Sequence, residues 1–286
     1  MPRILTQVRQ ASVADAPGML RLLDQALRQY ISFGNEDLGY LLAQNRVWLA
    51  DAADTLRGFL CVTPRFSSVA DLRALALING WRVDIGVRTL LAPVMRDLKE
   101  QDTAALVCLG AAPWLVPTLQ RAGFTLVDRI VYLERPIAPT PPPQNLQEKP
   151  QAVLRPIRGG DLAALLKLDG AAFDSLWRFD RGHFMELLVT TGHSTIAEKA
   201  EQPVGYAVSD VVGQTGFIVR LAVHPDFQGR GIGSQLLADS LDYCWAAGAA
   251  TVKLNTQESN VASHHLYQRF DFQSAGRRVP VLVRDL

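Results

Sequence analysis

The sequence predicts a mixed α/β protein built from two similar domains in tandem. Apolar runs typical of strands alternate along the chain with amphipathic runs typical of helices. A stretch with six prolines, residues 136–150, divides the 286 residues into two parts of similar length. Such a stretch excludes a helix or a central strand and favours a semi-rigid linker. Short motifs of the first part recur in the second at a nearly constant spacing.

The repeat extends through four elements in the same order. Its motifs are separated by 146 positions, except for the last, where the separation is 148. This regularity predicts a duplicated domain, with residues 1–135 and 151–286 as the two copies and 136–150 as the linker. The matched motifs are Arg9-x-Ala-x-x-x-Asp15 with Arg155-x-Ile-x-x-x-Asp161, Leu75-Ala76-Leu77 with Leu221-Ala222-Val223, Leu90-Leu91 with Leu236-Leu237, and Arg121-Ala122-Gly123-Phe124 with Arg269-Phe270-Asp271-Phe272.

The second copy shows its expected elements most clearly. Asp161 and Gly248 are suitable residues for a helix start and a helix end, and Pro203 and Gly213 favour turns between strands. Hairpins and crossovers together predict a mixed sheet. The expected order is a strand at 152–157, helices at 162–173 and 181–189, strands at 194–198, 204–212 and 217–223, a helix at 231–247, a strand at 251–256, a helix at 261–269 and two terminal strands.

The composition limits the kinds of partner and the compartment. Lys and Arg number 29 against 28 Asp and Glu, so the net charge of +1 gives no electrostatic case for nucleic acid or a membrane surface. Cys61, Cys108 and Cys244 lie in apolar stretches, which predicts buried thiols in a reducing compartment rather than disulfides or a metal site. With no signal segment and no run long enough to span a bilayer, we expect a cytoplasmic protein without a metal. The oligomeric state stays open.

A glycine-rich turn, Gln228–Gly233, stands between an apolar run and an amphipathic one. Backbone N–H groups at such a helix entry converge on one point, and the helix dipole favours an anion there. Glycine is needed because a Cβ would hold a phosphate away from the backbone. Ser234-Gln235 follows the last glycine, where a nucleotide P-loop requires Lys and then Ser or Thr, and the dinucleotide fingerprint has a different glycine spacing. The turn therefore predicts a phosphate site of another kind.

The turn and the residues after it resemble the GCN5-related N-acetyltransferase (GNAT) superfamily over residues 152–286. Gln228, Gly231 and Gly233 match its cofactor signature Q/R-x-x-G-x-G/A, and Asn260 with Tyr267 matches a later one. Asp271 stands where a glycine is usual, and Asp tolerates a left-handed backbone better than most residues. The resemblance implies a GNAT fold and transfer of an acetyl group from acetyl-CoA to an amine. It also implies a splayed strand pair that holds the pantetheine arm.

The first copy lacks these site residues. At the same spacing, Gly231 and Gly233 fall on Ile85 and Val87, whose branched side chains would fill the phosphate position. We therefore expect a degenerate GNAT-like domain in the first copy and a catalytic one in the second. The tandem arrangement is similar to that of the mycothiol synthases.

The resemblance implies a set of cofactor contacts, most of them from the backbone. The Val223 N–H is the expected donor to the thioester carbonyl as the oxyanion forms. The side chain of Arg230 either adds a charged contact or is solvated, and Asn260 either bonds the pantetheine arm or only caps the last helix. The full cofactor-binding set is Leu221, Ala222, Val223, Gln228, Gly229, Arg230, Gly231, Ile232, Gly233, Ser234, Asn260 and Tyr267.

Two proton transfers need side chains or water. Tyr267 is the expected acid for the leaving thiolate, with a core aromatic as the alternative. The ribosomal-protein alanine acetyltransferases use a Glu as base where this chain has Asn255, so that role is not carried over. Glu258, Asp210 and His264 are the remaining candidates for the base, and Glu258 is the one selected. Each of them also fits a solvated or structural role, and a water relay competes with all three.

The acceptor is expected at the loop after the first helix of the second copy. Trp177 together with Asp174 would suit an apolar amine with a cationic end, although Trp177 also fits a role as a core anchor. The acceptor is a small-molecule amine or a protein N-terminal amine; the residues do not choose between them. A non-catalytic module that binds acyl-CoA or a partner protein is the alternative function.

Overall fold

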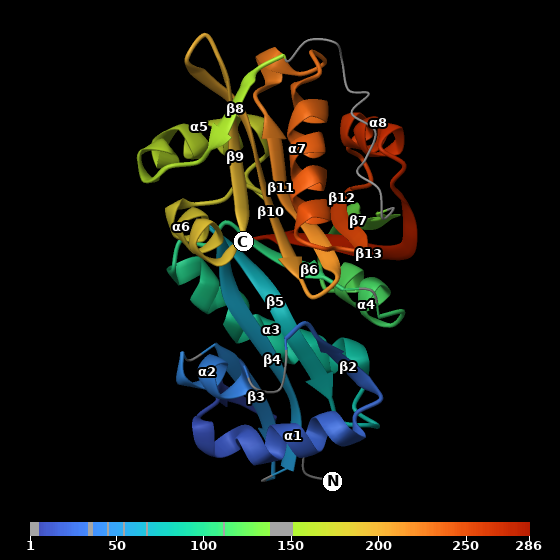
Figure 1. The fold of residues 1–286 in the computed structure, drawn as a ribbon. Coiled ribbons are helices and arrows are strands. Elements are labelled where there is room, and N and C mark those ends of the chain that lie inside the picture. Colours follow the sequence, from blue (N-terminus) through green and yellow to red (C-terminus); the bar gives the residue numbers. More distant parts are fainter. Residues whose placement is uncertain are drawn as a thin grey trace. The chain divides into compact units, whose positions relative to one another are not determined.

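The computed structural model describes residues 6–33, 37–44, 46–53, 55–66, 68–110, 112–137 and 151–286. Contacts divide the chain into two compact units (Figure 1). The first unit contains residues up to Arg129 together with Arg278–Leu286, and the second contains Ile130–Arg277. Most of the expected linker, residues 138–150, lies outside the described residues.

The first unit is a sheet with helices packed on it. Its strands follow the order β1-β3-β4-β5-β6-β13, and β2 pairs with β5. The elements are β1 (Gln7–Gln10), α1 (Ala16–Gln25), β2 (Arg28–Ile31), α2 (Leu38–Ala43), β3 (Val47–Ala52), β4 (Thr55–Phe66), β5 (Val69–Leu77), α3 (Val83–Glu100), β6 (Ala105–Leu109), α4 (Leu115–Arg121) and the start of β7 (Thr125–Pro136).

The second unit repeats this plan, with the strand order β7-β12-β11-β10-β9-β8. Its elements lie within a few residues of those expected from the sequence. They are β8 (Val153–Pro156), α5 (Leu162–Ala172), α6 (Arg181–Thr190), β9 (His193–Lys199), β10 (Gln202–Val212), β11 (Thr215–Val223), α7 (Ile232–Ala246), β12 (Thr251–Gln257), α8 (Val261–Arg269) and β13 (Gln273–Asp285).

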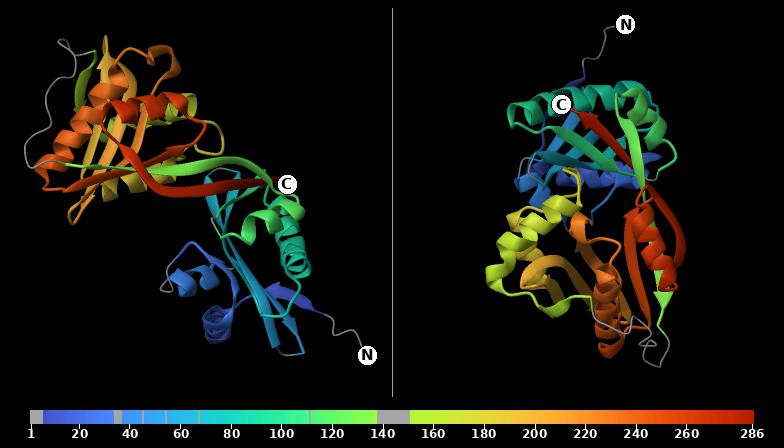
Figure 2. Two further views of the ribbon diagram at one scale, coloured as in Figure 1. Left: turned by 90° about the vertical axis from the view of Figure 1, so that its right-hand side faces the viewer. Right: turned by 90° about the horizontal axis from the view of Figure 1, so that it is seen from above.

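Each unit's sheet takes a strand segment from the other half of the chain. In the second unit, residues 130–136 of β7 pair antiparallel with β12. In the first unit, residues 281–285 of β13 pair antiparallel with β6. The expectation of two terminal strands was wrong, because β13 is one strand whose last residues find partners on β6 instead of turning back (Figure 2).

Both units share details that confirm their common plan. In each, a β-bulge interrupts the central antiparallel pair at the same place, after Cys61 in the first unit and after Val208 in the second. In each, a parallel strand pair stays together for only three residues, in β5 with β6 and in β11 with β12. The predicted mixed α/β class is therefore confirmed.

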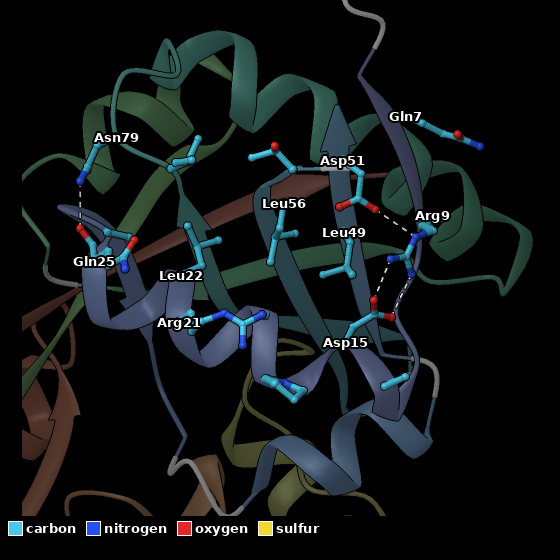
Figure 3. Close-up of a pocket in the computed structure, with 16 residues that line it drawn as sticks. Gln7, Arg9, Asp15, Arg21, Leu22, Gln25, Leu49, Asp51, Leu56 and Asn79 are labelled. Carbon is cyan, nitrogen blue, oxygen red and sulfur yellow. Dashed lines mark hydrogen bonds and ion pairs between the residues drawn. The ribbon is translucent and has the colours of Figure 1, made fainter. Parts of the chain in front are cut away.

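The arginine and aspartate of the first repeated motif form the same ion pair in both units. Arg9 contacts Asp15 at 2.7 Å and Asp51 at 3.0 Å, beside a surface pocket of the first unit (Figure 3). In the second unit, Arg155 contacts Asp161 at 2.8 Å and Glu198 at 2.6 Å. The arginine thus joins the first strand of each unit to the start of its first helix and to the neighbouring strand of the sheet, β3 or β9. This structural role explains why the motif is present in both copies.

We expect Asp161→Asn to destabilise the second unit measurably at neutral pH, because a charge-assisted bond to Arg155 is lost. Arg155 lowers the pKa of the Asp161 carboxyl. The stability that this carboxylate gives is therefore present above its unfolded pKa of about 4 and is lost as the pH falls through the lower folded pKa. Urea unfolding at several pH values should show the variant and the parent converging in acid. A difference that stays constant with pH would contradict this assignment.

The interiors of both units are mainly apolar. Cys61, Cys108 and Cys244 are buried free thiols, as the sequence predicted. Among the described residues, no helix has the length and apolar character needed to cross a membrane.

Candidate active site

A cavity opens where β11 and β12 separate. Residues Thr215–Phe217 of β11 pair in parallel with residues Thr251–Lys253 of β12. Beyond these three pairs the two strands diverge. The space between them has a volume of about 640 Å³. The predicted splayed pair is thus present, and we call the space the β11–β12 cavity. Its wall includes residues from the end of α5, from β11, from the glycine turn, from β12 and from α8.

The edge of β11 that faces this cavity carries backbone polar groups. The His224 N–H donates to the Val204 carbonyl at 2.8 Å, on the β10 side. Because successive residues of a strand alternate, the N–H groups of Leu221 and Val223 face the opposite side, toward the cavity. The Gln228 side-chain amide donates to the Val223 carbonyl at 3.0 Å, which places that carbonyl on the same side. Val223 therefore presents its N–H in the direction that the expected oxyanion contact requires.

The glycine turn closes one end of the cavity. Gly229 and Gly231 have φ values of +71° and +81°, a left-handed backbone that a β-branched residue would adopt only with strain. Helix α7 starts directly afterwards, and its first N–H groups have no carbonyl one turn earlier to bond. Gly229, Gly231, Gly233 and Ser234 line the cavity. The left-handed glycines and the start of α7 thus lie together at the cavity, and the anion site stays a prediction.

The arginine that lines the cavity beside this turn is Arg269 rather than Arg230. Arg230 lies over the ring of Phe227, 5.3 Å from its centre, and does not line the cavity. Arg269 lines it and donates to the Ser234 hydroxyl at 3.2 Å. Arg269 matches Arg121 of the first copy. Because this arginine is present in both copies, the repeat suggests a role in the fold and does not indicate that Arg269 lies beside the turn.

Helix α8 supplies the other predicted side chains. The Asn260 side chain caps the helix by accepting from the Ser263 N–H at 3.1 Å, and it also lines the cavity. Tyr267 is 6% exposed and lines the cavity as well. Burial raises the pKa of Tyr267 to about 12, so its hydroxyl keeps its proton at neutral pH. Asp271 adopts a φ of +59°, the left-handed conformation expected there.

The candidates for the base do not gather at the cavity. Glu258, Asp210 and His264 are absent from its lining, so the role of Glu258 stays a prediction. Asp210 instead accepts from the Gly192 N–H at 3.1 Å, and a ring nitrogen of His264 lies 3.1 Å from the Gln257 carbonyl oxygen. The side of the cavity next to β12 is lined by Asn255, Thr256 and Gln257.

At the other end, the loop after α5 forms the rim. Phe173 and Trp177 line the cavity, whereas Asp174 does not. The Asp174 carboxylate accepts from the Leu176 N–H at 3.0 Å and so shapes the turn. Of the two expected acceptor residues, the structure brings Trp177 to the cavity and gives Asp174 a local structural contact.

A buried polar network under this rim was not predicted. Asp169 is fully buried and accepts from the Tyr206 hydroxyl at 2.6 Å and from Arg220 at 2.6 and 2.9 Å. Arg220 lines the cavity. The three residues are far apart in the sequence and belong to no short motif. The one sequence signal for the network is a charged residue, Asp169, on an otherwise apolar face of a predicted helix.

The first unit differs at both ends of the corresponding region. Helix α3 starts at Val83, so its first turn takes the place of the glycine turn when Leu90-Leu91 is matched to Leu236-Leu237. Strand β2 pairs antiparallel with Ala74–Leu77, the counterpart of Arg220–Val223 (Figure 1). The chain itself therefore occupies the edge that is open in the second unit.

Comparison with known proteins identifies the fold and the class. The profile of the acetyltransferase (GNAT) family matches residues 162–272. A mycothiol acetyltransferase of Acidimicrobium ferrooxidans is 27% identical over 303 residues, with 94% of each chain covered. The ribosomal protein bS18 alanine N-acetyltransferase of Escherichia coli is 34% identical over 70 residues, which cover 24% of this chain and 47% of that enzyme.

Solved structures show the same architecture over the whole chain. A GCN5-related N-acetyltransferase of Sphaerobacter thermophilus has a TM-score of 0.66 at 17% identity and covers 100% of this chain and 96% of its own. A tandem GNAT protein from the clavulanic acid biosynthesis pathway has a TM-score of 0.61 at 16% identity, with 98% of each chain covered. At these identities the structures establish the fold alone. Residues 162–272 thus belong to the acetyltransferase (GNAT) family, and the chain is similar over its length to acetyltransferases and has the tandem GNAT fold.

Proposed function

We propose that the protein transfers the acetyl group of acetyl-CoA to a primary amine, and that the β11–β12 cavity of the second unit is the catalytic site. One observation carries the proposal: a left-handed glycine turn, an open strand edge and a buried tyrosine line the same cavity. The turn suits a diphosphate, the strand edge suits an amide-rich pantetheine arm, and the tyrosine suits a leaving thiolate. The GNAT family uses this cosubstrate in general.

In the proposed reaction, the amine nitrogen forms a bond to the thioester carbon and the carbon–sulfur bond then breaks. The Val223 N–H stabilises the negative charge that develops on the carbonyl oxygen. Tyr267 donates its proton to the departing thiolate, and the amine loses a proton to water. A proton from water then returns to Tyr267, so that the acid is restored for the next turnover. Water is the proposed acceptor of the amine proton because Asn255, Thr256 and Gln257 offer no carboxylate on that wall of the cavity.

The first unit is proposed to be inactive. Its helix α3 begins one turn earlier than α7 does, and β2 covers the strand edge that an acyl-CoA would need. Both differences take away space that acyl-CoA would occupy, which is more than the loss of a single contacting side chain. They support catalysis by the second unit alone.

The acceptor is proposed to be a primary amine that reaches the cavity past Phe173 and Trp177. Relatives named for mycothiol and for the alanine of a ribosomal protein support the two forms already considered, a small molecule or a protein N-terminus. The absence of a carboxylate among Asn255, Thr256 and Gln257 favours a second candidate, a module that binds acyl-CoA without turnover.

One experiment separates the two candidates. Binding of coenzyme A is measured by calorimetry, and thiol release from acetyl-CoA is then followed with a panel of small primary amines and N-terminal peptides. We expect micromolar binding and release that depends on an amine. Binding without release for any amine would support the module, and no binding would overturn both.

The pH dependence should reflect the amine and not the tyrosine. With a pKa of about 12, Tyr267 stays protonated across the assay range, so its acid form is lost only above that pH. The rate should therefore rise between about pH 6 and about pH 9 as an alkylamine with a pKa of about 10 loses its proton. With an amine of lower pKa, the rise in rate should move to lower pH by the difference between the two amine pKa values. A fall in rate within this range would contradict the assignment.

A further inference from the structure

The segment after the first helix has opposite positions in the two units. We call Phe173–Phe179 of the second unit the overhang. With the 146-residue spacing, β2 (Arg28–Ile31) matches residues 174–177 of the overhang. In the first unit this segment pairs as a strand with Ala74–Leu77, whereas in the second it forms a turn in which the Trp177 and Arg178 N–H groups donate to the Asp174 carbonyl. The same part of the fold thus covers the strand edge in the first unit and leaves it uncovered in the second.

Specific bonds hold β2 in its closed position. Arg73 donates from Nε to the Ser32 hydroxyl at 2.8 Å and from Nη2 to the Ser32 carbonyl at 2.9 Å. The Tyr30 hydroxyl donates to the Leu109 carbonyl at 2.9 Å. These bonds add to the strand pairing with β5. The first unit thus shows that this segment can pair as a strand with a neighbouring strand edge that would otherwise be unpaired.

Different bonds hold the overhang in its open position. Arg220 donates from Nη2 to the Trp177 carbonyl at 2.8 Å, and its guanidinium lies 3.6 Å from the ring centre of Phe173 and 4.0 Å from that of Phe179. Asp169 accepts from the Phe179 N–H at 2.8 Å and pairs with Arg220 at 2.6 Å. The overhang is therefore tied at its start, its middle and its end to one buried ion pair.

The first unit lacks every polar member of this network. Asp169 matches Leu23 and Arg220 matches Ala74 at the 146-residue spacing. Tyr206 matches Phe59, since each follows a glycine whose Cβ position faces a carbonyl of the central strand, Ala222 in one unit and Ala76 in the other. The loss of the ion pair and of the hydroxyl accompanies the closure of the edge.

We infer that Asp169, Tyr206 and Arg220 are positioning residues that hold the overhang off the Arg220–Val223 edge and so keep the β11–β12 cavity open to the acyl-pantetheine arm. Without them, residues 174–177 would pair with that edge, as β2 does with β5. This inference rests on the proposed function for its ligand. Its physical basis is that a buried ion pair hydrogen-bonded to the surrounding chain favours one arrangement of that chain.

The test uses a double variant that copies the first unit, Asp169→Leu with Arg220→Ala, because it leaves no buried carboxylate without its partner. Amide hydrogen exchange is measured on the ligand-free full chain, and coenzyme A binding by calorimetry. We expect slower exchange at Leu221 and Val223, whose N–H groups face the cavity, and affinity for coenzyme A weaker by at least about tenfold, since an open state must first be populated. Tyr206→Phe, which copies Phe59, should give smaller changes in the same directions.

Arg155→Ala is the matched control, because it removes an ion-paired arginine of the same unit that does not line the cavity. It should change neither the exchange at Leu221 and Val223 nor the affinity. Exchange at these two amides that is unchanged or faster in the double variant would overturn the inference, whatever happens to the affinity. The exchange measurement needs no ligand, so failure of the parent protein to bind coenzyme A would count against the proposed function only.

Discussion

Replacing Gly231 by valine should abolish coenzyme A binding while the second unit remains folded. Gly231 has a φ of +81° and lines the cavity, so a branched side chain would both strain the turn and occupy the anion position. Strain of this kind costs about 1–3 kcal/mol. We expect the affinity to fall by at least about a hundredfold, since the diphosphate would lose several backbone N–H contacts at once. Calorimetry with coenzyme A, together with a thermal melt, measures both parts of the prediction.

Gly248→Val is the control for strain. Gly248 follows the other end of the same helix α7, has the same φ of +81°, and has open space around its Cβ position. It should destabilise the unit to a similar extent and leave the affinity unchanged. If Gly231→Val bound coenzyme A within a few-fold of the parent protein, the glycine turn would not be the phosphate site.

Removing the hydroxyl of Tyr267 should lower turnover by about 10²–10⁴-fold, the usual contribution of a positioned general acid. Tyr267 is buried and protonated, so Tyr267→Phe takes away a proton donor and leaves the ring that packs at 5.8 Å from Phe272. Coenzyme A affinity should change much less than kcat. Steady-state kinetics with acetyl-CoA and the best amine of the panel gives both values.

Tyr243→Phe is the matched control, since that tyrosine stacks on His193 and does not line the cavity. Its turnover should equal that of the parent protein. Equal rates for Tyr267→Phe and the parent would remove Tyr267 from the mechanism and leave it as a core aromatic. A loss of affinity as large as the loss of turnover would assign it a binding role.

Local patterns were sufficient to predict most of the fold. The helices and strands of the second unit follow from hydrophobic periodicity, caps and turns, which depend on neighbouring residues. The exchange of strand segments could not be predicted in this way. Which strand pairs with β12 or with β6 depends on partners more than a hundred residues away, and the apolar pattern of a strand does not specify its neighbour.

The residues of the candidate site also fall into two groups, those that local sequence predicts and those that it does not. The glycine turn, the cap at Asn260 and the buried Tyr267 stand in one local stretch of chain and were predicted from it. Arg269 and the ion pair of Asp169 with Arg220 were not, because their contacts form only when α5, β11 and α8 come together. The identity of the base has no local pattern, and the structure places none of its three carboxylate and histidine candidates at the cavity.

Duplication makes the chain its own control. Both units keep the bulge, the diverging strand pair and the arginine–aspartate ion pair, so these features belong to the scaffold. The left-handed glycines before α7 and the open edge of β11 belong to the second unit, and they are the features on which the proposed activity depends. Comparing equivalent positions therefore separates residues that support the fold from residues that serve the site.

A crystal structure of the protein with coenzyme A tests this account most directly. We predict that the diphosphate lies against the backbone N–H groups of Gly229–Ser234, with the pantetheine arm along the Leu221–Val223 edge and the thiol near Tyr267. Coenzyme A bound beside α3 and β5 of the first unit, or bound with its diphosphate away from the glycine turn, would contradict it.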